Sequence, residues 1–288
     1  MLSVAKREFK SLFNTMTAEI FCAVLIAVTG IYFIVYNLNV GYPYFSFVLV
    51  SVVFIMMIIV PLLTMRSFSE ERRQKTDQLL LTSPLTVADI VLGKFIAMCG
   101  VLLIPVLVFM LCPLIISEMG EAHFATDYAT LFAFFVVGCF FISVGMFISS
   151  LTESQVIAAV CSIGALLIVY LWSGIVSLLP TEAGGTAVVL LIVWTLLALL
   201  FYAYAKNMLA AAGLWVAGLA ALLAIFLFAR DWLTGLLAKT LGGFAVTEIM
   251  TNFGENSLFD LQGIIKLVIV TAVMLFLTAQ SVEKRRWS

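Results

Sequence analysis

The sequence predicts an all-α, polytopic integral membrane protein with six to eight transmembrane helices, eight being preferred. The chain has 288 residues, of which 64% are hydrophobic and 11% are charged, whereas soluble domains are about 45–50% apolar and about 25% charged. Several uncharged runs reach the roughly 20 apolar residues that cross a bilayer. These runs do not alternate with period two, and a backbone in lipid must satisfy its own hydrogen bonds, so the spans are predicted to be helices.

The apolar runs define eight predicted spans. The first run, residues 20–65, is long enough for two spans around a turn at residues 37–43. The remaining runs follow in order: 95–117, 128–152, 154–181, 183–205, 207–229 and 261–282. Lys206 alone separates the sixth span from the seventh, and Lys266 in the last run is expected to snorkel. If one pair of runs does not cross, six spans remain, and both termini still lie on one side.

The distribution of basic residues predicts a multi-pass protein of the plasma (inner) membrane with cytoplasmic N- and C-termini. Basic residues are enriched in the cytoplasmic segments of membrane proteins. With cytoplasmic termini, the residues on the inner side are Lys6, Arg7, Lys10, Arg66, Arg72, Arg73, Lys75, Lys94, Lys206, Lys284, Arg285 and Arg286. Only Arg230, Lys239 and Lys266 lie outside. The reverse orientation would invert this bias.

The chain is therefore divided into an N-terminal cytoplasmic interfacial helix (1–18), a transmembrane domain (19–282) and a basic cytoplasmic tail (283–288). In the first segment, one helical face carries Phe9, Leu12, Phe13, Met16 and Ile20, which predicts a helix in the membrane interface. The apolar run that follows is too long for a signal peptide and is expected to be retained. An external segment, 230–260, is predicted to form short helices at the outer membrane face or a covering loop.

A cluster of charged residues interrupts the apolar sequence after the second predicted span. No charged residue lies between Glu19 and Arg66. The cluster then comprises Arg66, Glu70, Glu71, Arg72, Arg73, Lys75 and Asp77. Ser67 and Glu70 have the spacing of a capping box, so a helix is expected to begin at Phe68. Glu71 and Lys75 are spaced as a stabilising ion pair within that helix.

This cytoplasmic helix is predicted to occupy residues 67–82. Pro84 disfavours helical geometry in the residue before it, so the helix is expected to stop there. Thr86 and Asp89 form a second capping box, which begins the third span. From the residues alone, two interpretations remain open. The helix lies on the membrane surface with its charges in water, or it docks a soluble partner.

The remaining reactive side chains do not form a recognisable catalytic or metal site. The cysteines lie within apolar runs, without a CxxC or Cys/His cluster, and are interpreted as packing residues: Cys22, Cys99, Cys112, Cys139 and Cys161. His123 is the only histidine, and a solvated external loop accounts for it and for Glu118, Glu121 and Asp127. No catalytic, cofactor or metal residue is therefore predicted.

Gly93 and Lys94 do not belong to a phosphate-binding loop. Such a loop needs an earlier glycine and a Ser or Thr after the lysine, and Ala88 and Phe95 occupy those positions. Lys94 is instead interpreted as a snorkelling anchor at the entry to the third span. No cytoplasmic stretch is long enough for a nucleotide-binding domain, so the chain is expected not to be an enzyme.

The sequence RSFSEERRQKTDQLLLTSPLTVADIVLGKF, residues 66–95, resembles the segment after the second span of type 2 ATP-binding-cassette (ABC) transporter permeases, the gliding-motility-associated branch above all. The matching positions are Glu70, Glu71, Thr76, Leu79, Leu80, Pro84, Leu92, Gly93 and Lys94. Lys75 replaces a glycine of the family pattern, which favours a continuous helix. KREFKSLFNTMTAEIF (6–21) resembles the N-terminal interfacial helix of these permeases, and FISSLTESQVIAAV (147–160) resembles their turn between spans four and five.

The resemblance implies the permease subunit of an ABC transporter, with export as the family tendency, that couples ATP hydrolysis in a separate subunit to substrate movement. It assigns ATPase coupling to Phe68, Glu70, Glu71, Arg72, Arg73, Lys75, Thr76, Asp77, Leu79, Leu80 and Pro84. Gly93 and Lys94 stand at the span-three entry. The implied partners are ABC ATPase subunits, which bind ATP and Mg, a second identical or related permease, and membrane lipid. Independently of the resemblance, segment 230–260 is a candidate contact for an external partner. No nucleic acid and no cofactor of this chain are implied.

An alternative function remains open at this point. The chain could be a membrane scaffold or mechanotransmission subunit that docks an ATPase and passes force to an external partner without moving solute. The uncharged spans are compatible with both functions. A continuous cavity along a permease dimer would favour transport, and a sealed, tightly packed interface would favour force transmission.

Overall fold

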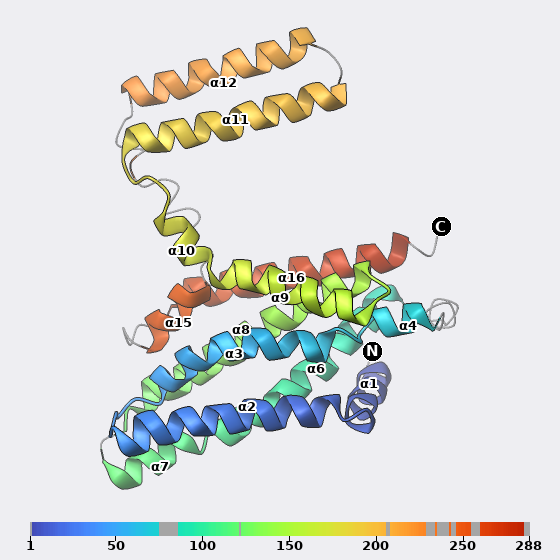
Figure 1. The fold of residues 1–288 in the computed structure, drawn as a ribbon, viewed down its shortest axis with the longest axis vertical. Coiled ribbons are helices and arrows are strands. Elements are labelled where there is room, and N and C mark those ends of the chain that lie inside the picture. The colour runs from blue at the N-terminus through green and yellow to red at the C-terminus, as the bar shows by residue number, and fades with distance from the viewer. Residues whose placement is uncertain are drawn as a thin grey trace. The chain divides into compact units, whose positions relative to one another are not determined.

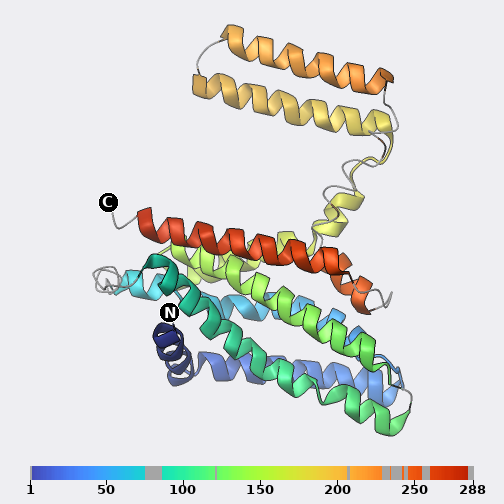
Figure 2. The same ribbon diagram turned by 180° about the vertical axis from the view of Figure 1, so that it is seen from behind.

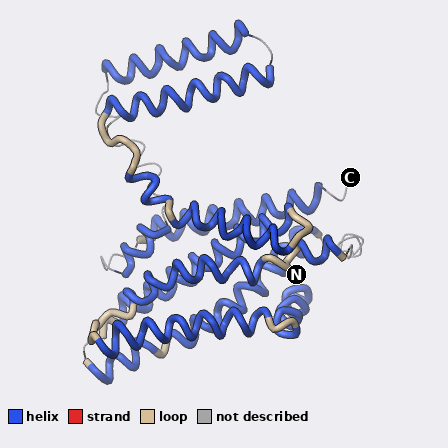
Figure 3. The backbone as a smooth tube through the Cα atoms, viewed as in Figure 1, coloured by secondary structure: helices blue, strands red, loops and turns tan. Residues whose placement is uncertain are grey.

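The computed structural model describes residues 2–74, 86–120, 122–205, 208–228, 234, 242, 246–254 and 260–284. Within these residues every regular element is a helix, as the sequence predicts (Figures 1 and 3). The chain forms two compact units. The first comprises Met1–Tyr170 and Val246–Ser288, and the second comprises Leu171–Ala245.

The first unit contains the elements that position the candidate site. They are α1 (Leu2–Asn14), α2 (Thr17–Phe33) with the π-helix η1 (Ile34–Asn39), α3 (Ser46–Thr64), α4 (Ser69–Arg73), α6 (Val87–Phe109), α7 (Cys112–Met119), α8 (Phe124–Leu151), α9 (Gln155–Tyr170), α15 (Val246–Gly254) and α16 (Leu261–Lys284). Among the described residues, five helical stretches are long and apolar enough to cross a membrane: Thr17–Asn39, Ser46–Arg73, Val87–Met119, Phe124–Leu151 and Leu261–Lys284. The helix α9 is a shorter apolar helix of 16 residues.

The helix α8 runs through the middle of this unit. It packs against α3, α6, α9, α15 and α16, and aromatic side chains such as Phe134 and Phe141 are fully buried along it. Two glycines, seven residues apart on one face, let its neighbours approach closely. A Cβ atom at Gly138 would overlap Leu102 of α6, and one at Gly145 would overlap Thr64 of α3. Small residues at such contacts are typical of packed membrane helices.

The two ends of the first unit carry different elements. The helices α1 and α4 and the C-terminal end of α16 lie at one end, which we call the N-terminal end (Figures 1 and 2). The helix α7, the turn between η1 and α3, and α15 lie at the other, which we call the α7 end. Both ends of the described chain therefore lie at the same end of the first unit.

At the α7 end, a buried carboxylate holds the start of α3. The carboxylate oxygen Oδ1 of Asp127, in the first turn of α8, accepts a hydrogen bond from the backbone N–H of Ser46 at 2.9 Å. The Ser46 hydroxyl in turn donates to the carbonyl of Gly254 in α15 at 3.1 Å. Asp127 has no exposed surface, so its interpretation as a solvated loop residue is wrong. It satisfies a helix N-terminus that would otherwise have an unpaired donor.

Within the segment 230–260, which the sequence predicts to be external, residues 246–254 form a helix that packs on the bundle rather than a covering loop. The helix α15 buries Val246, Ile249, Met250 and Phe253 and contacts α3, α8 and α9. The Asp260 carboxylate then accepts from the N–H of Gly263 at 2.8 Å, in the first turn of α16. Phe244 and Glu255 of the predicted segment lie outside the described residues.

The N-terminal helix buries its apolar face against protein. The chain breaks at Met16, whose positive φ of 57° separates α1 from α2. Val4 and Ala5 are buried, α1 packs against α6, and the ring of Phe9 lies 3.3 Å from where a Cβ of Gly100 would stand. Met16 and Ile20 are 64% and 57% exposed, so the prediction that they share this face is wrong, because the break redirects the chain.

The second unit is an apolar helical hairpin. It contains α10 (Trp172–Ser177), α11 (Ala183–Ala205) and α12 (Met208–Phe228), and the last two coincide with the sixth and seventh predicted spans. The indole N–H of Trp194 in α11 donates to the carbonyl of Leu214 in α12 at 3.3 Å. Its ring occupies the space that a Cβ of Gly218 would need, so the two helices are locked in register.

We expect Gly145→Ala to lower the thermal stability of the protein, by about 1–3 kcal/mol in the free energy of unfolding, because the added methyl overpacks Thr64. Gly164→Ala is the matched control, since a Cβ there meets no atom within 4 Å. The measurement is the fraction of detergent-solubilised protein that stays monodisperse after heating. Equal melting temperatures for the two variants would contradict the close approach of α3 and α8.

Candidate functional site

The start of α4 is capped from another helix. The Ser149 hydroxyl oxygen, in the last turn of α8, accepts from the backbone N–H groups of Phe68 at 3.2 Å and Ser69 at 3.3 Å. The same hydroxyl donates to the carbonyl of Met65 at 3.1 Å. Ser149 therefore does for α4 what an N-cap side chain does within one helix. It also fixes the end of α3 and the start of α4 against α8.

The predicted capping box of Ser67 and Glu70 is consequently wrong. The helix α4 begins at Ser69, with Phe68 in the N-cap position and no side-chain cap of its own. The Ser67 hydroxyl is buried without a hydrogen-bond partner in the described part of the chain. The Ser67 hydroxyl does not cap the helix, because the Ser149 hydroxyl of α8 accepts from the backbone N–H groups at its start. The capping box of Thr86 and Asp89 is confirmed, with the N–H of Asp89 donating to Thr86 Oγ1 at 3.2 Å.

Arg72 ties α4 to the turn between α8 and α9. Its guanidinium donates to the carbonyl of Ser150 at 2.8 Å, and it lies 3.8 Å from the carboxylate of Glu153. The Arg72 side chain is 12% exposed, whereas that of Glu153 is 74% exposed. The exposed side of α4 is formed by Arg73 and Gln74. Charged residues of α4 thus divide into those that hold the helix and those that face outward.

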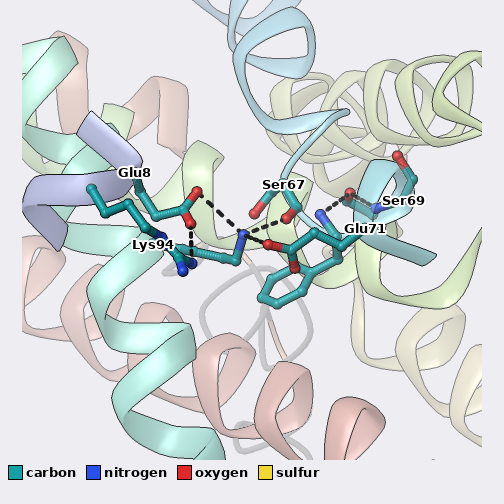
Figure 4. A network of polar contacts seen from close by, with 8 residues as sticks. Glu8, Ser67, Ser69, Glu71 and Lys94 are labelled. Atoms are coloured by element: carbon teal, nitrogen blue, oxygen red, sulfur yellow. Dashed lines mark hydrogen bonds and ion pairs between the residues drawn. The ribbon is translucent and has the colours of Figure 1, made fainter. Parts of the chain in front are cut away.

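The centre of the site is the ammonium group of Lys94, in the second turn of α6 (Figure 4). Its Nζ donates to Glu71 Oε1 at 2.7 Å, to the carbonyl of Ser67 at 2.8 Å and to Glu8 Oε2 at 3.3 Å. The ring of Phe68 lies 5.3 Å from it. A lysine has three N–H donors, and all three are used. The ammonium therefore joins α1, α4 and α6.

Lys94 is not the snorkelling anchor that the sequence predicts. Its side chain is only 2% exposed, whereas those of Glu71 and Glu8 are 21% and 19% exposed. Arg7 pairs with Glu8 at 2.9 Å, so two cations and two carboxylates balance each other. Removing one member of a buried pair leaves an uncompensated charge, which costs about 3–5 kcal/mol. Because these partners already neutralise and hydrogen-bond the ammonium, it does not need to extend to the membrane surface.

The structure brings together part of the predicted coupling set. Phe68, Glu71 and Lys94 converge, Arg72 faces α8, and Gly93 is buried in α6. Arg73 is exposed, and Glu70 accepts from the side-chain amide of Gln74 at 3.3 Å. The other predicted positions lie outside the described residues: Lys75, Thr76, Asp77, Leu79, Leu80 and Pro84. The predicted partner of Glu71, Lys75, is therefore not described, and Glu71 itself bonds Lys94. Among the described residues, no group of three or more His, Cys, Asp or Glu could hold a metal ion.

Sequence reasoning missed Glu8 and Ser149. Glu8 is the acidic residue inside an otherwise basic N-terminal segment, and Ser149 lies in a stretch that was assigned to a turn. A partial signal existed for Glu8, because a lysine within an apolar span is stable when a carboxylate neutralises it. No signal pointed to Ser149, whose partners are about 80 residues earlier in the chain.

We expect Ser149→Ala to loosen α4 and to destabilise the protein by about 1–2 kcal/mol, because two buried backbone donors lose their acceptor. Ser150→Ala is the control, since that hydroxyl donates to the carbonyl of Phe147 in its own helix. Limited trypsin digestion measures the effect through the rate of cleavage after Arg72 and Arg73. Unchanged cleavage in Ser149→Ala would show that α4 is held by other contacts.

Comparison with known proteins supports the sequence resemblance. The family model described as ABC-2 family transporter protein matches residues 4–187, a range that includes α4, α6, α8, all but the first two residues of α1, and every residue of the site. No curated protein matches the sequence, and the gliding-motility-associated branch stays a prediction. Because the match covers more than half of the chain, this protein belongs to the ABC-2 family of transporter proteins.

Proposed function

We propose that this chain is the permease subunit of an ABC exporter and that it couples ATP hydrolysis in a separate ATPase subunit to substrate movement. The observation that carries the proposal is the mounting of α4. Its inner side is fixed by Lys94, Ser149 and Ser150, while Arg73 and Gln74 remain exposed. A short charged helix with these contacts can transmit a movement of the ATPase to the bundle as a rigid element.

The position of α4 suits such a role. It follows α3 directly and precedes α6, and it lies at the N-terminal end of the bundle with α1 (Figure 1). An ATPase that moves α4 therefore acts on two spans through the chain itself and on α1 and α8 through side-chain contacts. Rigid movement of packed helices is a common way to switch between conformations. ATP and Mg would be bound by the ATPase, and a second permease, identical or related, would complete the pathway.

We expect Arg73→Glu to weaken binding of the ATPase subunit about tenfold, which corresponds to about 1.4 kcal/mol, because it reverses a charge at the exposed side of α4. The measurement is the amount of ATPase that copurifies with the tagged permease at increasing salt. Leu79→Asp, in the predicted part of the same helix, should have a similar effect. Glu71 is a poorer probe, because its replacement also breaks the bond to Lys94.

The control for this experiment lies at the α7 end. Glu248→Lys reverses an exposed charge on α15, which the proposal places on the opposite side of the membrane. This variant should copurify with the ATPase as the unchanged protein does. Copurification that is equally strong in Arg73→Glu and Leu79→Asp would remove α4 as the docking helix. A permease that is purified gently without any ATPase would contradict the proposed function as a whole.

The proposed orientation places the N-terminal end in the cytoplasm. In a variant that lacks the native cysteines, we expect Met119→Cys, at an exposed position of α7 (67%), to react with a membrane-impermeant maleimide in intact cells. We expect Gln74→Cys to react only after permeabilisation. The physical reason is the basic bias of the cytoplasmic side. The opposite labelling pattern would invert the topology and separate α4 from any cytoplasmic ATPase.

A further inference from the structure

The helix α4 is attached to the bundle on two sides, and the two attachments differ in chemistry. On one side, Lys94 bonds Glu71, the Ser67 carbonyl and Glu8. We call these four groups the Lys94 cluster. On the other side, the contacts with α8 are a serine hydroxyl and a backbone carbonyl, which bond Ser69 and Arg72 among others. Unless α6 and α8 move together, α4 cannot move and keep both attachments. It must stay fixed to one of these helices and shift relative to the other.

The Lys94 cluster is the stronger attachment. Hydrogen bonds between ionised groups are roughly twice as strong as neutral ones, and the ammonium is almost completely buried. Separating it from Glu71 would remove one of the two carboxylates that compensate the buried ammonium in the described part of the chain. On the α8 side, Arg72 donates at 2.8 Å to the neutral carbonyl of Ser150, and its ionic contact with Glu153 is long, at 3.8 Å, with Glu153 74% exposed. Water can replace that contact when the helices separate.

The same cluster connects α1 to α6. Glu8 brings α1 to Lys94, and Phe9 packs at Gly100, six residues further along α6. Val4 and Ala5 of α1 are buried as well. The N-terminal half of α6 is thus held to α1 by one ionic contact and by apolar packing. These contacts do not pass through α8.

We propose that Lys94 is a positioning residue for coupling: it keeps α4 fixed to α6 and α1, so that a displaced α4 carries these two helices with it and separates from α8. This proposal rests on the proposed function, because the displacement is attributed to an ATPase. Under this proposal, the contacts of α4 with Ser149 break and re-form during the cycle, whereas its contacts with Lys94 persist. Lys94 does not touch substrate or nucleotide and acts only through the helices that it joins.

The test measures two distances within the permease–ATPase complex. Spin labels are attached at Gln74→Cys on α4 together with either Ile96→Cys on α6 or Leu151→Cys on α8, in protein that lacks the native cysteines. Ile96 and Leu151 are 39% and 52% exposed, so labels there do not disturb the core. Labelled permease is diluted with unlabelled permease, and complexes without nucleotide are compared with complexes trapped by ATP and vanadate.

We expect the distance between labels 74 and 96 to stay constant on trapping and the distance between labels 74 and 151 to change. A change between 74 and 96, or a constant distance between 74 and 151 while other parts of the permease respond to trapping, would overturn the proposal. A complex that contains no ATPase, or that shows no nucleotide-dependent change at any position, would instead contradict the proposed function. The two failures are therefore distinguishable.

Substitution of Lys94 provides the second readout. We expect Lys94→Met to lower permease-stimulated ATP turnover about tenfold and to broaden the 74–96 distance, while the ATPase still copurifies. The conservative variant Lys94→Arg keeps the positive charge and the hydrogen-bond donors, and it should retain both signals. Lys10→Met, at an exposed position of α1, is the matched control and should leave turnover unchanged.

Two further results decide the role of Lys94. Full turnover and a sharp 74–96 distance in Lys94→Met would overturn the proposal, since the helices would then be held together without the ammonium. If Lys94→Met does not accumulate in the membrane, Glu71→Gln decides in its place, because it removes one charge and keeps a hydrogen-bond acceptor. The proposal then requires a broadened 74–96 distance in Glu71→Gln, and an unchanged distance would refute it.

Discussion

The arrangement at the N-terminal end of the bundle depends on the cost of burying one positive charge. An ammonium group removed from water must be paired and hydrogen-bonded, and the side chain of Lys94 is almost completely buried. That requirement draws Glu71 of α4 and Glu8 of α1 to the same point on α6. The position of α4 then follows, because a five-residue helix is too short to hold its own place. The charged residues of this apolar chain are thus concentrated where they determine geometry.

The helix α8 organises the rest of the first unit by capping two helices, one at each of its own ends. Asp127 in its first turn accepts from the start of α3, and Ser149 in its last turn accepts from the start of α4. Between these two caps, Gly138 and Gly145 let α6 and α3 approach closely. The segment formed by α3 and α4 is therefore aligned with α8 along its whole length. Unpaired N–H groups at helix starts are costly in an apolar surrounding, so each cap also specifies which helix lies beside which.

What the sequence predicted correctly is what depends on neighbouring residues. The apolar runs predicted helices in the right places, and Thr86 predicted its own cap because the partner, Asp89, is three residues away. Three of the errors share one cause, which is a partner that lies far along the chain. Ser67 was assigned a cap that Ser149 supplies, Lys94 was assigned to the membrane surface, and Asp127 was assigned to a solvated loop. In each case a local rule gave a reasonable result, and tertiary contact between residues roughly 20 to 90 positions apart replaced it. The part of the coupling segment beyond Gln74 remains a prediction from the resemblance.

The hairpin of α11 and α12 has a consequence for how such a chain can vary. Its two helices are joined through Trp194 and Gly218, and the chain is compact on either side of it without residues 171–245. Two antiparallel helices return the polypeptide to the side from which it departed. A pair of this kind can be gained or lost in evolution without inverting α16 or the tail that follows, whereas the loss of a single helix would turn the remainder of the protein inside out.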